Sequence, residues 1–183
     1  MTAPLNQLLF YLSILFYSPV TFISQETEIS FDFSQNNLEL IFHHLETPEL
    51  EKEKARAALL QIDTASQIDS YLTEYTPGFG ELKLQSKQFH KNKRQLDAKL
   101  TFSFTDKESS LKALGIYHVD GKYHYALLKK ESVLSTNGKV LHENGQKFIV
   151  WDEAHELIEL KLKHKALDDP NLQKMVNAKK YWQ

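Results

Sequence analysis

The chain of 183 residues contains no cysteine. This absence excludes disulfide bonds, thiolate metal sites and cysteine nucleophiles, and it leaves the redox environment unspecified. Only two arginines occur, Arg56 and Arg94. Because the arginine fork is the preferred partner of phosphates and base edges, their scarcity argues against nucleic acid as a partner. The formal net charge of −2 gives no basic field that would point the other way.

Long apolar stretches are also missing, apart from residues 8–23. This run of about 16 residues is shorter than the roughly 20 that a membrane-spanning helix needs, and it is typical of a signal-peptide core. We therefore expect residues 1–24 to be a signal peptide, or else a membrane anchor, ahead of a single domain over residues 25–183. The protein is then exported to the periplasm or cell envelope. No lysine or arginine precedes Lys52, which is unusual for a signal peptide, so a buried segment of the fold is a further alternative.

The clearest structural pattern is LGIYHVDGKYHYALL, residues 114–128. Two runs of strand-forming residues flank Asp120-Gly121, a dipeptide that favours a type I′ hairpin turn because both residues tolerate positive φ. A two-residue turn fixes the register and divides the side chains between two faces. We expect the first of these faces to pack into the core. The first face carries Leu114, Ile116, His118, Tyr123, Tyr125 and Leu127, and the second carries Tyr117, Val119, Lys122, His124, Ala126 and Leu128.

Before residue 80 the pattern predicts one strand over residues 29–33, followed by two or three helices. Asn36-Asn37 offers a helix cap, and Thr47-Pro48 is typical of a second helix start that extends to about residue 62. A third helix over residues 68–75 ends at Thr76-Pro77-Gly78. The first helix is lined by Leu38, Leu40, Ile41 and Leu45.

After residue 80 the apolar period changes to two, which predicts strands. Strands are expected to begin at Leu82 and to cover residues 96–104, and a polar loop over residues 106–110 leads into the central hairpin. Asn137-Gly138 and Asn144-Gly145 are strong hairpin signals with glycine at positive φ, implying strands near 132–136, 139–143 and 146–151. A last strand covers residues 158–162, and Asp169-Pro170 begins a short closing helix.

These elements predict an α+β fold in which an N-terminal strand and two or three helices precede an antiparallel meander of about six or seven strands. The short C-terminal helix closes the sheet. The order of elements is similar to that of the helix-grip ligand-binding folds. This resemblance is topological and rests on no motif, so it implies a curved sheet and no function.

Six residues of the hairpin region form a candidate ligand-binding site. Aromatic walls with a few polar tips are what ligand pockets need, although cross-strand aromatic pairs are equally ordinary stabilisers of a sheet. The candidate residues are Tyr117, His118, Tyr123, His124, Tyr125 and Trp151.

The segment WDEAHELIE, residues 151–159, offers a catalytic alternative. It begins like a zinc-protease motif, but Glu159 stands where the second histidine is required. We interpret it as a solvated turn entering a strand, and we assign no catalytic residue, metal or cofactor. The expected function is a non-catalytic exported domain that binds a protein partner or an apolar small ligand through its sheet. The alternatives are a hydrolase-like or metal-dependent enzyme using Asp152, Glu153, His155 and Glu159, and a membrane-anchored structural component of the envelope.

Overall fold

The computed structural model describes residues 22–48, 52–64, 82–91, 93–164 and 175–182. Strands make up 63% of the structure and helices 14%, so the fold is mostly β. Within the described ranges there are two α-helices, α2 (Lys52–Thr64) and α4 (Lys107–Ala113). The predicted α+β class with its N-terminal helices is therefore wrong.

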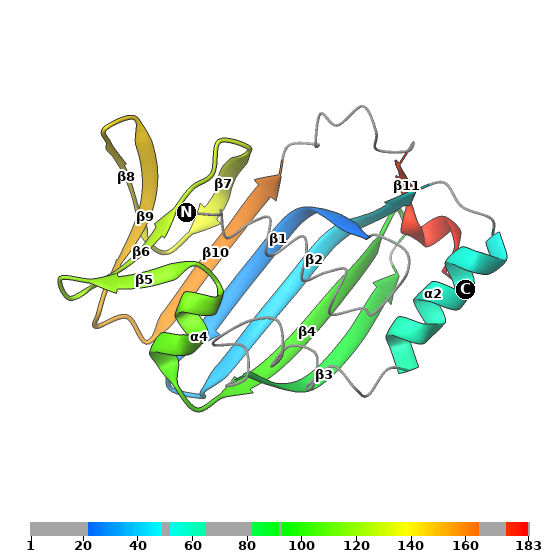
Figure 1. The fold of residues 1–183 in the computed structure, drawn as a ribbon, viewed down its shortest axis with the longest axis horizontal. Coiled ribbons are helices and arrows are strands. Elements are labelled where there is room, and N and C mark those ends of the chain that lie inside the picture. Colours follow the sequence, from blue (N-terminus) through cyan, green and yellow to red (C-terminus); the bar gives the residue numbers. More distant parts are fainter. Residues whose placement is uncertain (1–21, 49–51, 65–81, 92, 165–174, 183) are drawn as a thin grey trace.

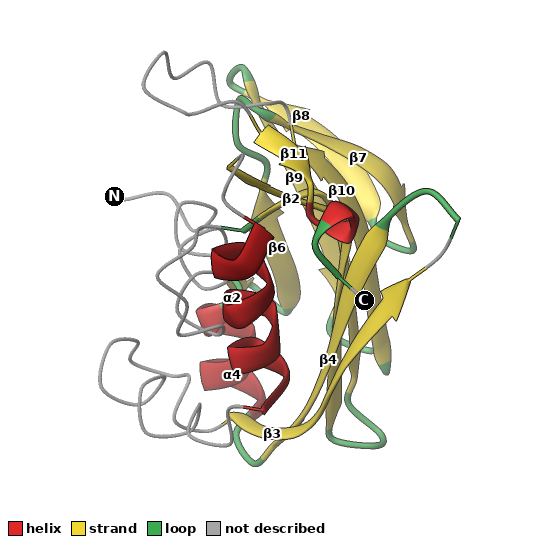
Figure 2. Ribbon diagram, turned by 90° about the vertical axis from the view of Figure 1, so that its right-hand side faces the viewer, coloured by secondary structure: helices red, strands yellow, loops and turns green. Residues whose placement is uncertain are grey.

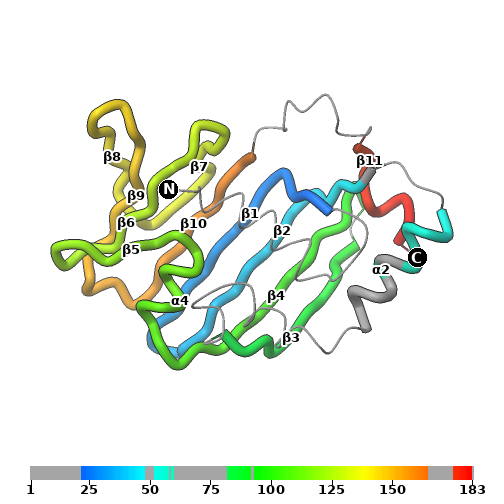
Figure 3. The backbone as a smooth tube through the Cα atoms, viewed as in Figure 1, coloured from blue at the N-terminus to red at the C-terminus, as the bar shows by residue number. Residues whose placement is uncertain are grey.

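The larger sheet, sheet A, is antiparallel and has the strand order β3-β4-β2-β1-β10-β7, with β11 pairing with β2 near its end. Figure 3 shows how β10, from late in the chain, lies beside β1 from its beginning. The strands of sheet A are β1 (Ile23–Asp32), β2 (Asn37–Pro48), β3 (Leu82–Lys91), β4 (Leu96–Phe104), β7 (Glu131–Thr136), β10 (Leu157–His164) and β11 (Met175–Asn177).

The smaller sheet, sheet B, has the order β5-β6-β9-β8 and projects from one end of sheet A (Figure 1). The predicted turns at Asp120-Gly121 and Asn144-Gly145 are confirmed, because all four residues have φ between 50° and 76°. The predicted register of the central hairpin is confirmed too, with Ile116 opposite Tyr125. The strands of sheet B are β5 (Ile116–Val119), β6 (Lys122–Ala126), β8 (Lys139–Glu143) and β9 (Gln146–Asp152).

The predicted helix over residues 38–45 is instead part of β2. Leu38, Leu40 and Phe42 alternate with more exposed residues and are buried, which is a period of two. Asn36 is a turn residue with φ 49° between β1 and β2, and not a helix cap. Thr47 is buried at the end of the same strand, so it does not begin α2.

The predicted hairpin at Asn137-Gly138 is wrong in a way that shapes the whole fold. Strands β7 and β8 flank this dipeptide as expected, but β7 pairs with β10 in sheet A and β8 pairs with β9 in sheet B. The dipeptide is therefore a crossover between sheets. Gly138 accordingly lies outside the set of glycines with positive φ, which contains Gly121 and Gly145.

Two further predictions are corrected. The polar segment after β4 is helix α4, which begins where the side chain of Asp106 accepts a hydrogen bond from Ser109 N at 2.9 Å. The closing helix falls partly outside the described residues, and its remainder is strand β11 followed by a 3₁₀ turn, η2 (Ala178–Lys180). The helix-grip resemblance is not supported, because the described part of this end, residues 175–182, forms strand β11 and a single 3₁₀ turn.

The core lies on one side of sheet A, where α2 and α4 both pack (Figure 2). Alternate residues of the central strands, such as Phe31, Leu40 and Leu160, point into it. Trp151 and Tyr125 of sheet B belong to the same buried cluster. Sheet B therefore buries one face against the core and turns its other face away.

The predicted leader lies mostly in residues 1–21, outside the described ranges. Strand β1 begins at Ile23, and Phe22 and Ser24 are both buried, so the predicted boundary after residue 24 falls inside β1. Among the described residues no helix is long and apolar enough to cross a membrane. The leader itself stays a prediction.

The crossover glycine generates a test. A Cβ atom at Gly138 would lie 2.6 Å from Trp151 Nε1 and 2.9 Å from Ile149 Cγ2. We expect Gly138→Ala to lower the free energy of unfolding by about 1–3 kcal/mol, because the buried indole must shift. Chemical denaturation measures this loss.

The loss should shrink when Gly138→Ala is made in a Trp151→Phe background, which removes the indole nitrogen. Gly145→Ala is the matched control, since no atom lies within 4 Å of the added Cβ. Its cost of about 1 kcal/mol comes from positive φ alone and should not depend on Trp151. Equal losses at Gly138 in both backgrounds would contradict the proposed clash.

Candidate functional site

The outer face of sheet B is the side turned away from the core, and it forms the first candidate site. Strand registers place one apolar row, Ala126–Phe148–Leu141, across this face. Val150 is buried but does not belong to the core cluster. The outer face carries Tyr117, Val119, Lys122, His124, Ala126, Lys139, Leu141, Glu143, Gln146, Phe148, Val150 and Asp152.

Large apolar side chains on this outer face are accessible. Tyr117 is 49% exposed, Val119 50% and Leu141 39%. Charges lie along its margins, where Lys122 is opposite Asp152. A four-stranded surface with an apolar middle and a charged margin resembles the composition of protein interfaces more than that of an enclosed ligand pocket.

The six residues of the predicted ligand site do not line one cavity. Tyr123, Tyr125 and Trp151 are at most 3% exposed and pack in the core, whereas Tyr117 and His124 lie on the outer face. These positions agree with the two faces predicted for the hairpin. Some aromatic side chains of the predicted ligand site therefore pack in the core, and others lie on the surface.

His118, the sixth residue, extends beyond the core face toward α4. Its Nδ1 lies 3.4 Å from Glu108 Oε1, and its Nε2 lies 3.6 Å from Glu153 Oε2. A shallow hollow of about 310 Å³ lies beside it. Both ring nitrogens thus face carboxylates, an arrangement that links α4, β5 and the turn after β9 by surface ion pairs whenever the ring is charged. The hollow is lined by Glu108, Ser109, Leu111, Lys112, Ile116, Tyr117 and His118.

The residues of the catalytic alternative do not gather around one point. Glu153 contacts His118, while His155 Nδ1 lies 3.1 Å from the carbonyl of Asp152. Glu159 is on β10, where its backbone N–H donates to Asn137 Oδ1. Within the described ranges, no group of three histidine, aspartate or glutamate side chains is arranged to hold a metal ion.

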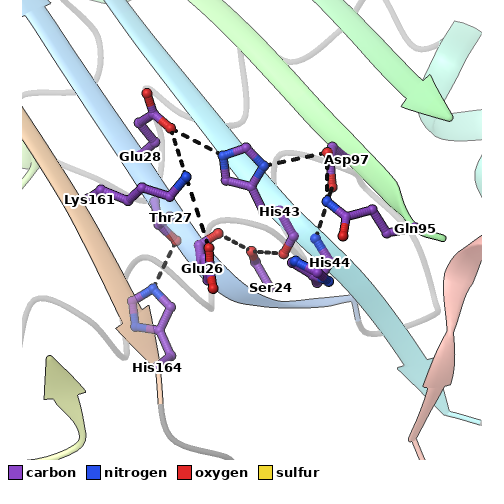
Figure 4. Close-up of polar contacts among 10 residues, drawn as sticks. All are labelled: Ser24, Glu26, Thr27, Glu28, His43, His44, Gln95, Asp97, Lys161 and His164. Carbon is purple, nitrogen blue, oxygen red and sulfur yellow. Dashed lines mark hydrogen bonds and ion pairs between the residues drawn. The ribbon is translucent and has the colours of Figure 1, made fainter. Parts of the chain in front are cut away.

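A second candidate is the polar cluster around His43 on sheet A, on the side of the sheet opposite α2 and α4 (Figure 4). The ring of His43 on β2 lies between Glu28 on β1 and Asp97 on β4, with Nε2–Oε2 and Nδ1–Oδ2 distances of 3.2 and 3.4 Å. Lys161 on β10 reaches Glu28 at 3.3 Å and Glu26 at 4.0 Å. Ionisable side chains on four neighbouring strands thus face one another.

The His43 cluster has the chemistry of cross-strand pairing. Partial burial raises the pKa of Glu28, but hydrogen bonds from His43 and Lys161 more than offset this and leave it below its ordinary value. Asp97 also accepts from His44 N and from the side chain of Gln95. These contacts occupy the groups with one another, so the cluster is a stabilising ladder of cross-strand pairs worth a few tenths to about 1 kcal/mol each.

A third group, whose side chains are largely buried, joins β6 of sheet B to β7 and β10 of sheet A. Both carboxylate oxygens of Glu131, whose side chain has 0% exposure, lie within hydrogen-bond distance of the Tyr125 hydroxyl, and Oε2 also accepts from Leu128 N. His164 is 7% exposed; its Nε2 lies 2.9 Å from Thr27 Oγ1 and its Nδ1 has no hydrogen-bond partner. The distance from that nitrogen to Glu131 Oε1 is 3.9 Å.

Burial controls the ionisation of this group. Desolvation lowers the pKa of His164 to about 4, although the charge of Glu26 opposes the shift. Desolvation raises the pKa of Glu131, partly offset by its hydrogen bonds from Leu128 and Tyr125. The pKa of Tyr125 lies well above its ordinary value because of burial and then the neighbouring Glu131. The sequence indicates no role for Glu131 or His164, because no local pattern brings the two residues together.

Comparisons with known proteins give no family assignment. No family model matches this chain, and no curated protein matches it.

The buried histidine predicts a pH dependence. The unfolded chain takes up the His164 proton near pH 6.5, but the folded chain takes it up only near pH 4. The contribution of neutral His164 to the free energy of unfolding is therefore fully present above pH 6.5. It falls as the pH drops toward 4, by up to about 3 kcal/mol. Urea unfolding across this range measures the loss.

The variant His164→Gln keeps a donor toward Thr27 but does not titrate. Between pH 6.5 and 4 its free energy of unfolding should fall by about 3 kcal/mol less than that of the wild type. Parallel losses in the two proteins would show that His164 is not the acid-sensitive group.

Proposed function

We propose that this protein is a non-catalytic exported domain that binds a protein partner through the outer face of sheet B. The observation that supports this most is the exposure of Tyr117, Val119 and Leu141 on one sheet face. The reverse face carries Tyr123, Tyr125 and Trp151, which are buried in the core. Exposed apolar side chains gathered on one face, as opposed to scattered singly, mark interaction surfaces. Export rests on the apolar run at residues 8–23.

The partner is expected to present a flat, apolar surface. Tyr117 is a suitable anchor, because a tyrosine buries a large ring at low conformational cost and still offers a hydroxyl. Lys122 and Asp152 at the margin favour polar groups at the edge of the contact. An apolar small ligand fits less well, since Tyr123 and Trp151, which would line an enclosed pocket, belong to the core.

A photo-activatable benzoylphenylalanine at position 119 tests this proposal in intact cells. Val119 is half exposed, and a partner on the outer face should be cross-linked to it. The same probe at Leu134, which is 47% exposed on β7 of sheet A, is the matched control and should give no such adduct. The adduct identifies the partner by mass spectrometry.

Binding of the purified partner then decides the question. Tyr117→Asp should weaken it by about tenfold or more, because a charge replaces an apolar anchor at the contact. Leu134→Asp, an equally polar change at an equally exposed site, should leave the affinity unchanged. Equal effects of the two substitutions, or identical adducts from both probe positions, would contradict the proposed face.

A further inference from the structure

Strand β8 is an edge of sheet B, and in the described part of the chain β9 is its only partner. All five of its residues are exposed, including two apolar ones, Val140 at 43% and Leu141 at 39%. Such an edge is a template on which another strand can pair.

The geometry of the β8–β9 hairpin determines which backbone N–H and C=O groups of β8 can pair with another strand. Glu143 and Gln146 flank a two-residue turn and therefore form a hydrogen-bonded pair. Since hydrogen-bonded and non-hydrogen-bonded pairs alternate along an antiparallel ladder, Leu141 also bonds toward β9. The N–H and C=O groups of Val140 and His142 consequently point away from the sheet.

We propose that β8 pairs with β8 of a second copy of this chain, antiparallel, across a two-fold axis at Leu141. Each Leu141 then faces the partner subunit's Leu141 in a non-hydrogen-bonded pair, where side chains approach most closely. Val140 and His142 exchange backbone bonds with the partner subunit's His142 and Val140. Two four-stranded sheets become one eight-stranded sheet.

Charge complementarity selects this register and this occupant. The axis at Leu141 places Lys139 directly opposite the partner subunit's Glu143, and the symmetry repeats the pair. An axis at Val140 would place Lys139 against leucine, and an axis at His142 would place Glu143 against leucine. The segment KVLHE is therefore complementary to itself, and its charged ends specify one alignment instead of blocking the edge.

The dimer shares Leu141 with the proposed binding face, whereas Tyr117 and Val119 of that face lie on β5 at the opposite edge of sheet B. Self-association is measured without the partner, so its failure and the failure of the proposed function are distinguishable. A contact between five-residue strands is small compared with interfaces of stable dimers. Association should accordingly be weak and concentration-dependent, and the dimer would join the two outer faces into one continuous surface.

Sedimentation velocity of the full chain, from about 1 μM to about 1 mM, tests the proposal. The wild type should change from monomer to dimer within this range. Lys139→Glu and Glu143→Lys should each weaken dimerisation by about tenfold, because two attractive cross-strand pairs become repulsive. An equimolar mixture of the two variants should dimerise as the wild type does, since opposite charges face each other again in the mixed dimer.

Lys147→Glu on β9 is the matched control, a charge reversal at an exposed position of the same hairpin that is not on the edge, and it should leave dimerisation unchanged. Circular dichroism checks that each variant is folded. Wild-type protein that stays monomeric to about 1 mM overturns the proposal. So does association that neither reversal weakens, or that mixing does not restore. Pairing of this edge only with a different added protein would assign it to that partner and equally overturn the proposal.

Discussion

The hydrogen bonds of Asn137 determine how the two sheets are joined. Its Oδ1 accepts from Trp151 Nε1 at 2.8 Å and from Glu159 N at 2.9 Å, and its Nδ2 donates to the carbonyl of Leu157 at 2.9 Å. One side chain thus provides hydrogen-bond partners both for the buried indole of sheet B and for the backbone of β10 in sheet A. A buried indole N–H without a partner would cost about 1–3 kcal/mol. Gly138 leaves room for the ring beside it. This junction turns Trp151 inward and leaves the outer face of sheet B and strand β8 accessible.

The parts that could be predicted from the sequence are those determined locally. Asp120-Gly121 and Asn144-Gly145 form two-residue turns because their residues accept positive φ, and each turn fixes the register of its own hairpin. Alternation in β4 likewise identifies the side chains that point into the core, such as Leu100. For the same reason the division of the central hairpin into a buried and an exposed face was correct, except at His118, which was placed on the core face and is exposed.

The remainder depends on contacts between distant segments. Leu38 and Leu40 fit a helical stripe as well as a strand, and only pairing with β1 and β4 decides for β2. Asn137-Gly138 has the composition of a hairpin turn, but Trp151 and Glu159 convert it into a crossover. Glu131 and His164 lie opposite each other at one end of the β7–β10 pairing, and no local pattern indicates this contact. Tertiary packing overrides local propensity at each of these places.

The central claim is that sheet B presents an open edge and an open face beyond its packed side. Amide hydrogen exchange measured residue by residue tests the edge most directly. We expect the amides of Val140 and His142 to exchange rapidly in dilute solution and to become protected as the protein concentration rises. The amide of Leu141, which points toward β9, should be protected at every concentration. Protection of Val140 and His142 that is already complete in dilute solution, or that never changes with concentration, would contradict this account.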